Sequence, residues 1–394
     1  MNQRQLFLRH VAQTSESPLL VEVARAEGSF IYDPEGKAYL DLISGIGVSN
    51  VGHCAPEVVK AVQEQAAKYM HTMVYGEFVL TPQVELAQLL SQNLPGNLDN
   101  FYFVNSGSEA VEGALKLAKK YTGRSEIIAF HQSYHGSTHG ALSVTGAPEL
   151  KDGFGPFLAQ VKFEAFGSMD MIQAISEETA AVIVEPIQGE AGIQVAEKSW
   201  LKALRQRCDE TGTLLIFDEI QSGFGRTGTL FAFQGYDVIP DILLMAKGMG
   251  GGMPIGAFAS SQSIMQVLTH DPVLGHISTF GGHPVNCAAS LATLQKILDE
   301  KLMERVSNLE AIIRSKLELE PVQELRGTGL IFAAEVGDFD FVLRIIERCL
   351  KNGVLTDWFL HCNTAIRIAP PLTISEIELS NGLDVLANAI QSES

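Results

Sequence analysis

A lysine at the end of an apolar run is the residue in this sequence best placed for covalent chemistry. Lys247 follows DILLMA (241–246) and precedes the glycine-rich stretch GMGGGMP (248–254). A lysine between an apolar strand and such a loop is partly removed from water, which lowers its pKa and suits its amine to Schiff-base formation. Because most lysines lie at the surface with the amine in water, Lys247 does not decide the function by itself.

An anion-binding pattern follows another apolar run. The segment NSGSE (105–109) comes directly after FYFV (101–104). Ser106 and Glu109 have the spacing of a capping box, and Gly107 lets backbone amides at a helix start approach an anion closely. An ordinary capped helix has the same residues, so this segment is also ambiguous alone.

A carboxylate and an amide follow a third run, TLLIF (213–217), as Asp218 and Gln221. Ligands of open α/β sheets bind at the carboxyl ends of the strands, so these residues, Lys247 and the segment 105–109 are expected at one edge of the sheet. A phosphorylated pyridine aldehyde needs a lysine, an acid that keeps the ring nitrogen protonated, and an anion site. All three occur at strand ends, which predicts a site for a cofactor of this kind.

Short apolar runs alternate with helical patterns from about residue 100 to 260. Continuous apolar runs separated by helices predict an α/β unit with a largely parallel sheet covered on both faces. A helix is expected over 109–120, with Gly123 as its end. The expected strands are FYFV (101–104), EIIAF (126–130), AAVIVE (180–185), TLLIFDE (213–219), DILLMA (241–246) and IGAFAS (255–260).

The domain boundaries have to come from changes in pattern, because the chain has no repeat and no long linker. We expect a large cofactor-binding domain over 46–285 and a smaller α+β domain over 286–394. The smaller domain contains the β-like segment AIRIAP (365–370), and the N-terminal segment 1–45 is expected to join it.

Composition excludes several classes of protein. With 394 residues, of which 46% are hydrophobic, the chain can fill more than one core. Its formal net charge of −18, without a concentrated basic patch, argues against a nucleic-acid partner. No stretch approaches the roughly 20 apolar residues of a membrane span, and the start lacks a signal-peptide pattern, so a cytoplasmic protein is expected. The five scattered cysteines predict neither disulfides nor a metal site.

Seven segments, in order between about residues 20 and 375, resemble the signature segments of class III pyridoxal phosphate (PLP) aminotransferases. The likeness is greatest to the acetylornithine, ornithine and 4-aminobutyrate enzymes of that family. It implies the fold type I of PLP-dependent aminotransferases and a ping-pong transfer of an amino group, from an ornithine-like donor such as N-acetylornithine to a 2-oxo acid. The segments are NSGSEAVEGALKLAKKY, SYHGSTHGALS, VEPIQGEAG, LLIFDEIQSGFGRTG, AKGMGGGMPIGA, STFGGHPVNCAAS and IRIAPPL.

The resemblance assigns cofactor contacts position by position. Lys247 would bind the aldehyde and move the proton during transfer. Thr279 would reach the phosphate of the neighbouring subunit's cofactor, which implies a homodimer with composite active sites. The other expected contacts are Asp218 with the ring nitrogen, Gln221 with the phenolic oxygen, Tyr134 with the ring face, and Ser106, Gly107 and Ser108 with the phosphate.

The resemblance also implies how substrates bind. Arg367 would bind a substrate α-carboxylate, and Glu190 would neutralise this arginine when a different substrate binds. This pair favours transamination over racemisation or amino-group migration, because it lets two unlike substrates share one site. One position departs from the family: Ser137 of HGST stands where the related enzymes have an arginine that binds a second carboxylate. Ornithine-like, β-amino-acid and ω-amine donors, and pyruvate as acceptor, therefore stay open.

Four other polar residues near these motifs are expected to have structural roles. Glu185 is interpreted as a structural residue, and the resemblance implies that Arg226 is an ion-pair partner in the interior or at an interface. His135 and His139 are interpreted as hydrogen-bonding residues, because the lysine already performs the proton transfer.

A competing pattern, GFGRTG (223–228), fits the dinucleotide fingerprint G-x-G-x-x-G and would indicate a nicotinamide-dependent oxidoreductase. Four residues separate it from Asp218, however, and TLFAFQGYD (229–237) is β-like rather than a helix that could face a pyrophosphate. A non-catalytic binding module would require the loss of Lys247 or Asp218, and both are present.

Overall fold

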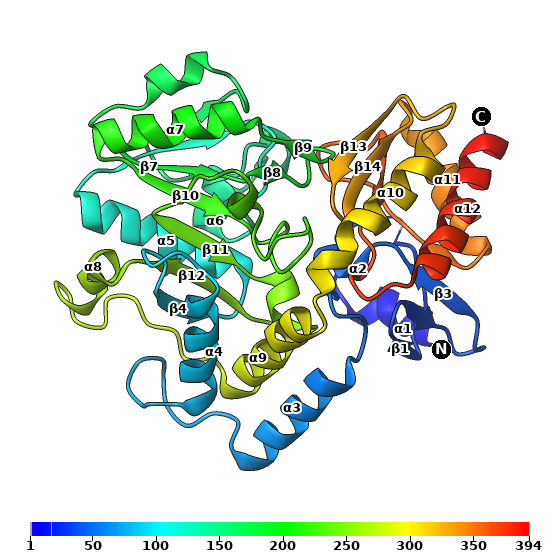
Figure 1. The fold of residues 1–394 in the computed structure, drawn as a ribbon, viewed down its shortest axis with the longest axis horizontal. Coiled ribbons are helices and arrows are strands. Elements are labelled where there is room, and N and C mark those ends of the chain that lie inside the picture. The colour runs from blue at the N-terminus through cyan, green and yellow to red at the C-terminus, as the bar shows by residue number, and fades with distance from the viewer. Residues whose placement is uncertain (1, 17, 394) are drawn as a thin grey trace.

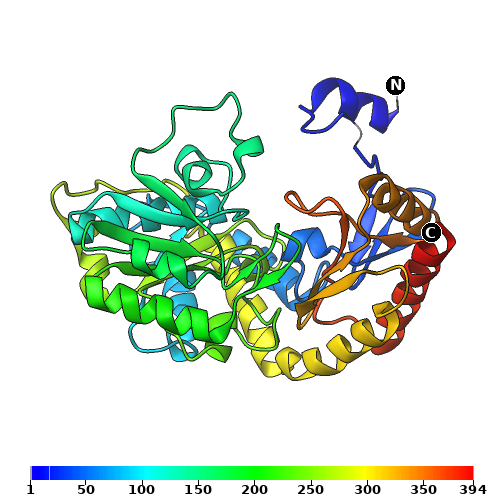
Figure 2. The same cartoon turned by 90° about the horizontal axis from the view of Figure 1, so that it is seen from above.

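The structure is a computed structural model that describes residues 2–16 and 18–393. Met1, Ser17 and Ser394, which belong to the predicted segments 1–45 and 286–394, lie outside the described residues. Figures 1 and 2 show two parts side by side, one built on a large sheet and one on smaller sheets near both chain ends. The arrangement is that of a mixed α/β fold, as the sequence predicts.

A seven-stranded sheet forms the centre of the larger part, in the order β4-β12-β11-β10-β7-β5-β6. All its strands are parallel except β12, which is antiparallel to both neighbours. The six expected strands are confirmed, while β6, a short and half-exposed edge strand, was missed. The strands are β4 (Asn100–Val104), β5 (Glu126–Phe130), β6 (Val161–Glu164), β7 (Thr179–Val184), β10 (Leu214–Asp218), β11 (Ile242–Met245) and β12 (Gly256–Ser260).

Both faces of this sheet are buried. In β10, Leu214 and Ile216 join the apolar cluster that contains α5 (Gly107–Thr122). Leu215 and Phe217 join the cluster that contains α7 (Lys198–Thr211). Successive side chains of a strand point to opposite faces, so a continuous apolar run is what a doubly covered strand requires.

Helix α5 confirms the helix expected over 109–120. It begins two residues earlier and ends two residues later than the prediction. Gly123 follows it with a φ of 69°, in the left-handed region that stops helices most easily when the residue is glycine. The helix therefore starts shortly after β4 and returns the chain to the amino ends of the parallel strands, where β5 begins.

The smaller part combines the two ends of the chain. β15 (Val354–Leu355) pairs in parallel with β3 (Ala38–Asp41), which belongs to a sheet with β1 (Arg25–Glu27) and β2 (Phe30–Tyr32). The segment expected as a strand at 365–370 is confirmed as β16. Its antiparallel sheet consists of β13 (Glu324–Thr328), β14 (Ile331–Glu335) and β16 (Ala365–Ile368).

Long helices connect and cover these sheets. α9 (Pro284–Asp299) packs against α3 (Pro56–Lys68) and α4 (Thr81–Gln92) and leads into the smaller part. The predicted boundary between residues 285 and 286 falls in its first turn, and the domain limits stay a prediction. The smaller part adds α10 (Val306–Leu317), α11 (Phe339–Lys351) and α12 (Glu376–Glu393).

The glycine-rich segment 223–228 forms successive turns after β10. The expectation of a β-like segment at 229–237 is wrong, because residues Ala232–Gly235 form a 3₁₀ turn, and Phe231 and Phe233 at this turn are buried. No α-helix begins within this described stretch, so the fingerprint lacks the helix that a dinucleotide site needs.

Arg226 of this loop is buried, as expected, but it forms no ion pair among the described residues. Its guanidinium donates to the carbonyls of Leu330 and Pro370 and to the side-chain oxygen of Asn50. Burial lowers the pKa of this guanidinium to about 10. Arg226 therefore ties the loop after β10 to the smaller part through neutral acceptors.

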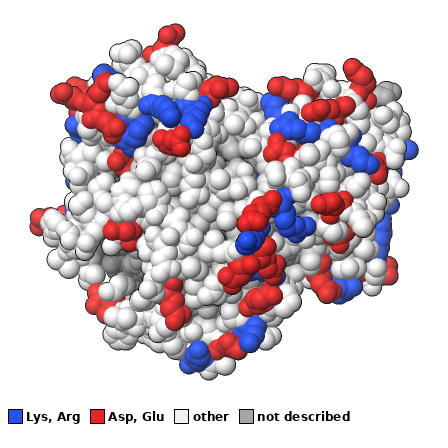
Figure 3. All heavy atoms as spheres, in the orientation of Figure 1, with Lys and Arg blue, Asp and Glu red and all other residues white. Residues whose placement is uncertain are grey.

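Surface charge and helix character are the two features that relate to binding partners and membranes. On the face shown in Figure 3, Lys and Arg side chains lie interspersed with Asp and Glu. Within residues 2–16 and 18–393, no helix combines the length and the apolar character needed to cross a membrane.

Candidate active site

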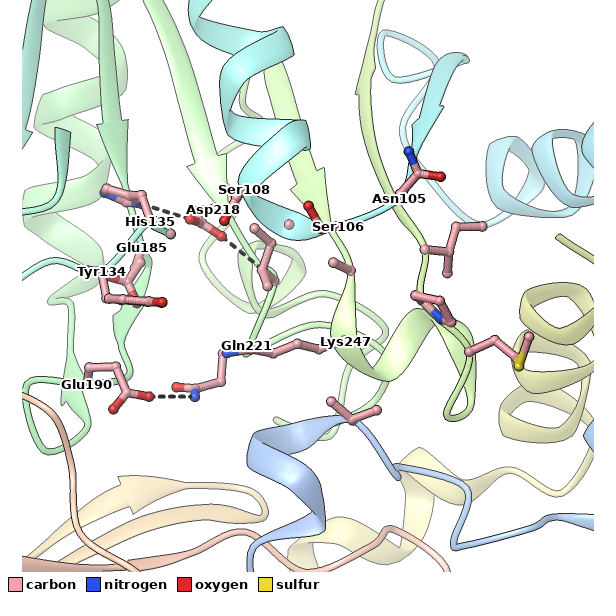
Figure 4. Close-up of a pocket in the computed structure, with 18 of the residues that line it drawn as sticks. Asn105, Ser106, Ser108, Tyr134, His135, Glu185, Glu190, Asp218, Gln221 and Lys247 are labelled. Carbon is pink, nitrogen blue, oxygen red and sulfur yellow. Dashed lines mark hydrogen bonds and ion pairs between the residues drawn. The ribbon is translucent and has the colours of Figure 1, made fainter. Parts of the chain in front are cut away.

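A cavity of about 380 Å³ lies at the carboxyl ends of β4, β5, β10 and β11. The expectation that the polar strand-end residues share one edge is confirmed (Figure 4). Three residues assigned from the sequence, Ser137, Thr279 and Arg367, do not line this cavity. The assigned residues that do line it are Ser106, Gly107, Ser108, Tyr134, Glu190, Asp218, Gln221 and Lys247.

Lys247 presents a free amine to the cavity. The residue follows β11 in the left-handed region, with a φ of 46°, an uncommon conformation for a side chain larger than glycine. Burial lowers the pKa of its amine against the opposing effect of the Glu190 carboxylate, and Arg367 adds to the lowering. In the described part of the chain, no hydrogen bond or ion pair involves this amine. It is therefore available to react with an aldehyde.

Asp218 is held by a buried histidine. Its Oδ2 lies 2.7 Å from Nδ1 of His135, and its Oδ1 accepts the N–H of Ile220 at 3.1 Å. His139 is bonded as well, with Nε2 at 2.6 Å from the carbonyl of Pro156. The expectation that both histidines are satisfied hydrogen-bonding residues is confirmed for one nitrogen of each ring, whereas the buried Nε2 of His135 has no partner in the described chain. The pair between His135 and Asp218 fixes the direction of a carboxylate at the cavity wall.

The start of α5 offers free backbone donors. Ser106 caps the helix by accepting the N–H of Glu109 at 3.2 Å. The capping box is only half formed, because the Glu109 carboxylate accepts the main-chain and side-chain N–H groups of Asn105 instead. Among the residues that the structure describes, the N–H groups of Gly107 and Ser108 have no acceptor. A helix N-terminus with free N–H groups suits a phosphate.

Gly136 permits a close approach to this helix start. Its φ is 124°, and a Cβ atom built on it would overlap the side chain of Ser108. A larger residue at this position would displace the serine or the loop that carries Tyr134. The positive φ and the lack of a Cβ atom at Gly136 therefore maintain the shape of the cavity at the start of α5.

Glu185 anchors the neighbouring segments. One carboxylate oxygen accepts the N–H of Tyr134 at 2.9 Å, and the other accepts the N–H of Gly189 at 3.0 Å. Burial raises the pKa of Glu185 to about 7. These bonds agree with its expected structural role, although the side chain also contacts the cavity.

Gln221 lines the cavity together with Asp218 and Glu190. Its Nε2 donates to Glu190 at 3.2 Å, and its buried Oε1 has no partner in the described chain (Figure 4). Gly189 provides the room for this amide, because a Cβ atom there would overlap it. An unsatisfied buried amide oxygen indicates that a further hydrogen-bonding group belongs at this position.

Arg367 of β16 is paired with Glu190. The two guanidinium nitrogens lie 3.1 and 2.9 Å from the two carboxylate oxygens, and both side chains are buried. Although burial acts to raise it, the Arg367 charge holds the pKa of Glu190 down at about 2. The arginine is thus neutralised from the cavity side, as expected for the pair.

The remaining supports of Arg367 were not found from the sequence. Asp357 accepts its Nε at 2.9 Å, the carbonyl of Trp358 accepts a terminal nitrogen at 3.1 Å, and the guanidinium lies 4.3 Å from the ring centre of Phe359. These residues belong to a loop between β15 and β16, whose spacing carries no motif. Only the spatial pairing of the loop with β16 reveals them.

Thr279 is exposed and lies outside the cavity of this single chain. The neighbouring Ser278 accepts the side-chain N–H of Asn105 at 3.2 Å, so this loop is tied to the start of α5. Its assignment to a partner subunit's site stays a prediction.

The family model for class-III aminotransferases matches residues 11–390. The chain belongs to the class III aminotransferases. The acetylornithine aminotransferase of Methanopyrus kandleri is 42% identical over 100% of both chains. That of Archaeoglobus fulgidus is 40% identical over 96% of this chain and 98% of its own length.

Solved structures of related enzymes have the same fold. The ornithine aminotransferase from Toxoplasma gondii matches with a TM-score of 0.91 and 29% identity, over 98% of this chain and 93% of its own. An (S)-enantioselective omega-transaminase from Thermomicrobium roseum matches with a TM-score of 0.88 and 32% identity, over 100% and 98%. The aminotransferase therefore has the fold type I architecture, and its cofactor is PLP.

The cavity has the chemical groups that PLP requires. Free N–H groups at the start of α5 fit its phosphate, and a fixed carboxylate fits its ring nitrogen. The unpartnered Oε1 of Gln221 can accept a hydrogen bond from its phenolic hydroxyl. When bound, this cofactor supplies an aldehyde and an electron sink, and the residues of the aminotransferase position and protonate the groups around it.

We predict that borohydride reduction of the PLP-loaded aminotransferase fixes the cofactor on Lys247, because this amine is free and its pKa is lowered. Peptide mass mapping should locate the label there. Lys247→Ala should lose both the label and turnover. Lys151→Ala is the control, since burial also lowers the pKa of Lys151 but this residue lies outside the cavity. A label on another lysine, or full turnover by Lys247→Ala, would contradict the assignment.

Proposed function

We propose that this aminotransferase moves the ω-amino group of an ornithine-like donor, such as N-acetylornithine, to a 2-oxo acid by a ping-pong mechanism. The observation that carries the proposal is the bidentate pair of Arg367 and Glu190 beside the cavity. A guanidinium that a carboxylate can neutralise suits a site that takes an ω-amine in one half-reaction and a carboxylate in the other. The names of the curated relatives support the donor.

The proposed roles follow the geometry. Lys247 binds the cofactor's aldehyde and moves the proton, while His135 keeps the Asp218 carboxylate directed at the ring nitrogen. Tyr134 covers the ring face. Phosphate contacts come from Ser106, Gly107 and Ser108, a hydrogen bond to the phenolic oxygen from Gln221, and the α-carboxylate contact from Arg367.

A second candidate donor class has support from one position. Ser137 is exposed and lies outside the cavity, where its hydroxyl is 3.3 Å from that of Tyr134. It has no charge to bind a second carboxylate, which favours an ω-amine or β-amino-acid donor with pyruvate as acceptor. The related omega-transaminase structure agrees with this alternative. A racemase or aminomutase would not need the pair of Arg367 and Glu190.

A homodimer in the cytoplasm is part of the proposal. Segments 70–79 and 273–283 contact each other through His71 and Phe280, whose ring centres are 5.0 Å apart. Both segments expose several apolar side chains, and a contiguous exposed apolar surface is typical of protein interfaces. The apolar side chains that these segments expose are Met70, Met73, Phe78, Val79, Val273, Leu274, Ile277 and Phe280.

The donor half-reaction tests the main proposal. N-acetylornithine added alone to the PLP-loaded enzyme should bleach its yellow absorbance, and a 2-oxo acid added afterwards should restore it, as a ping-pong mechanism requires. Stopped-flow absorbance measures both steps. A chromophore that N-acetylornithine leaves unchanged, while other amines bleach it, would exclude this donor and favour the second candidate.

The acceptor preference tests the role of Ser137. A carboxylate without a cation is costly to bury, so 2-oxoglutarate should have no advantage over pyruvate. Ser137→Arg should raise the relative kcat/KM for 2-oxoglutarate by about tenfold to a hundredfold, equivalent to about 1.4–2.8 kcal/mol of transition-state binding. Ser137→Gln controls for side-chain length without charge. A wild-type preference for 2-oxoglutarate above about a hundredfold would show that another cation serves this carboxylate.

The dimer makes a separate prediction about Thr279. If its hydroxyl contacts the partner subunit's PLP phosphate, Thr279→Val should weaken PLP binding by about tenfold, the effect of one lost hydrogen bond, while the dimer persists. Equilibrium dialysis of PLP and sedimentation measure the two properties, with Thr269→Val as the control at another exposed threonine. An active monomer, or unchanged PLP affinity, would disprove this role.

A further inference from the structure

Four side chains beyond the Tyr134 ring form a polar group that we call the distal cluster: Tyr134, Ser137, Glu149 and His361. The hydroxyls of Tyr134 and Ser137 are 3.3 Å apart, and the rings of Tyr134 and His361 have centres 6.4 Å apart. Nδ1 of His361 lies 3.6 Å from the Glu149 carboxylate. Of the four, only Tyr134 lines the PLP cavity, so the cluster continues the site outward from that ring.

His361 is a buried side chain that lacks hydrogen-bond partners. Only 2% of it is exposed, and neither ring nitrogen has a partner in the described chain. Its position is well defined, because its N–H donates to the carbonyl of Glu190 at 3.0 Å and the adjacent Leu360 N–H donates to the Glu190 carboxylate at 3.1 Å. A buried imidazole with two unsatisfied nitrogens indicates a missing polar group.

The charges around the distal cluster are negative. Burial lowers the pKa of the His361 ring, which favours its neutral form, while Glu149, Glu190 and the backbone of Ser133 and Leu360 act to raise this pKa. Of the nearby cations, Arg367 is bound by Glu190 and Asp357. Lys151 donates to the carbonyl of Ser143 and lies 4.1 Å from the ring centre of Phe163.

We propose that the distal cluster binds a primary ammonium group at the far end of the amino donor. A neutral imidazole nitrogen, two hydroxyl oxygens and a carboxylate can all accept hydrogen bonds, and an ammonium offers three donors. A distal carboxylate would instead face Glu149 and Glu190, and the neighbouring Arg367 and Lys151 already have partners among the described residues. This inference rests on the proposed transfer of an ω-amino group and, among ornithine-like donors, favours α,ω-diamines over N-acetylornithine, whose second nitrogen is an uncharged amide.

A matched pair of donors tests this directly. 1,4-Diaminobutane and 4-aminobutanoate carry the same reacting amine on chains of similar length and differ at the distal end. Neither has an α-carboxylate, so Arg367 stays paired in both reactions. With pyruvate as acceptor, the wild-type holoenzyme should have a kcat/KM for the diamine at least about tenfold higher, and added salt should reduce this preference.

Variants of the distal cluster separate recognition from folding. His361→Phe should lower kcat/KM for 1,4-diaminobutane about tenfold, mainly through KM, and His361→Gln should restore part of it by supplying an acceptor. Glu149→Gln should lower it only about threefold, because this side chain is 62% exposed and its charge is screened. Glu177→Gln, at an exposed glutamate before β7, should change neither donor.

The outcomes are distinguishable from failure of the proposed function. A wild-type preference for 4-aminobutanoate would overturn the inference. Equal effects of Glu149→Gln on both donors would also overturn it, by indicating a structural contact between Glu149 and His361. If neither of these amines reacts while N-acetylornithine does, the inference fails and the proposed function stands. If no amino donor bleaches the bound PLP, both fail.

Discussion

A buried guanidinium must be surrounded by acceptors, and this requirement of Arg367 organises one side of the active site. An uncompensated charge in this position would cost far more than the fold could offset. Glu190 provides two acceptor oxygens, and Asp357 and the Trp358 carbonyl provide one each. Glu190 follows the large sheet, whereas the other two come from the smaller part. One electrostatic requirement therefore joins the two halves of the chain at the site.

Three carboxylates at the active site have different pKa values because their surroundings differ. Glu190 makes two bonds to Arg367, and its pKa is held at about 2. Asp357 makes one bond, and burial raises its pKa to about 6 despite the same guanidinium. Glu185 meets only backbone N–H groups, and burial raises its pKa to about 7. The hydrogen-bond geometry around each carboxylate, and not the residue type, therefore decides which of the three has the lowest pKa.

The sequence predicts the parts of this structure that local pattern controls. Apolar runs predict six of the seven large-sheet strands, and the polar residues after them share one cavity because parallel strands end at one edge. Edge strand β6 has the half-exposed, mixed sequence VKFE and does not stand out as an apolar run. The segment 229–237 looks like a strand because of its aromatic residues, but these fill the core from a turn. Asp357, Phe359 and His361 depend on a loop that meets Glu190 across the fold, and no spacing rule contains that contact.

The antiparallel strand β12 acts as a spacer in the sheet. It separates β4, which leads into the free N–H groups at the start of α5, from β11, which leads into Lys247. Neighbouring strands lie about 4.8 Å apart, so these two chain ends are held about 10 Å apart. Because β12 runs the opposite way, its amino end lies at the same edge, and the apolar residues Met253, Pro254 and Ile255 that precede it line the cavity. The reversed strand thus keeps the start of α5 and Lys247 two strand spacings apart, and apolar side chains line the cavity between them.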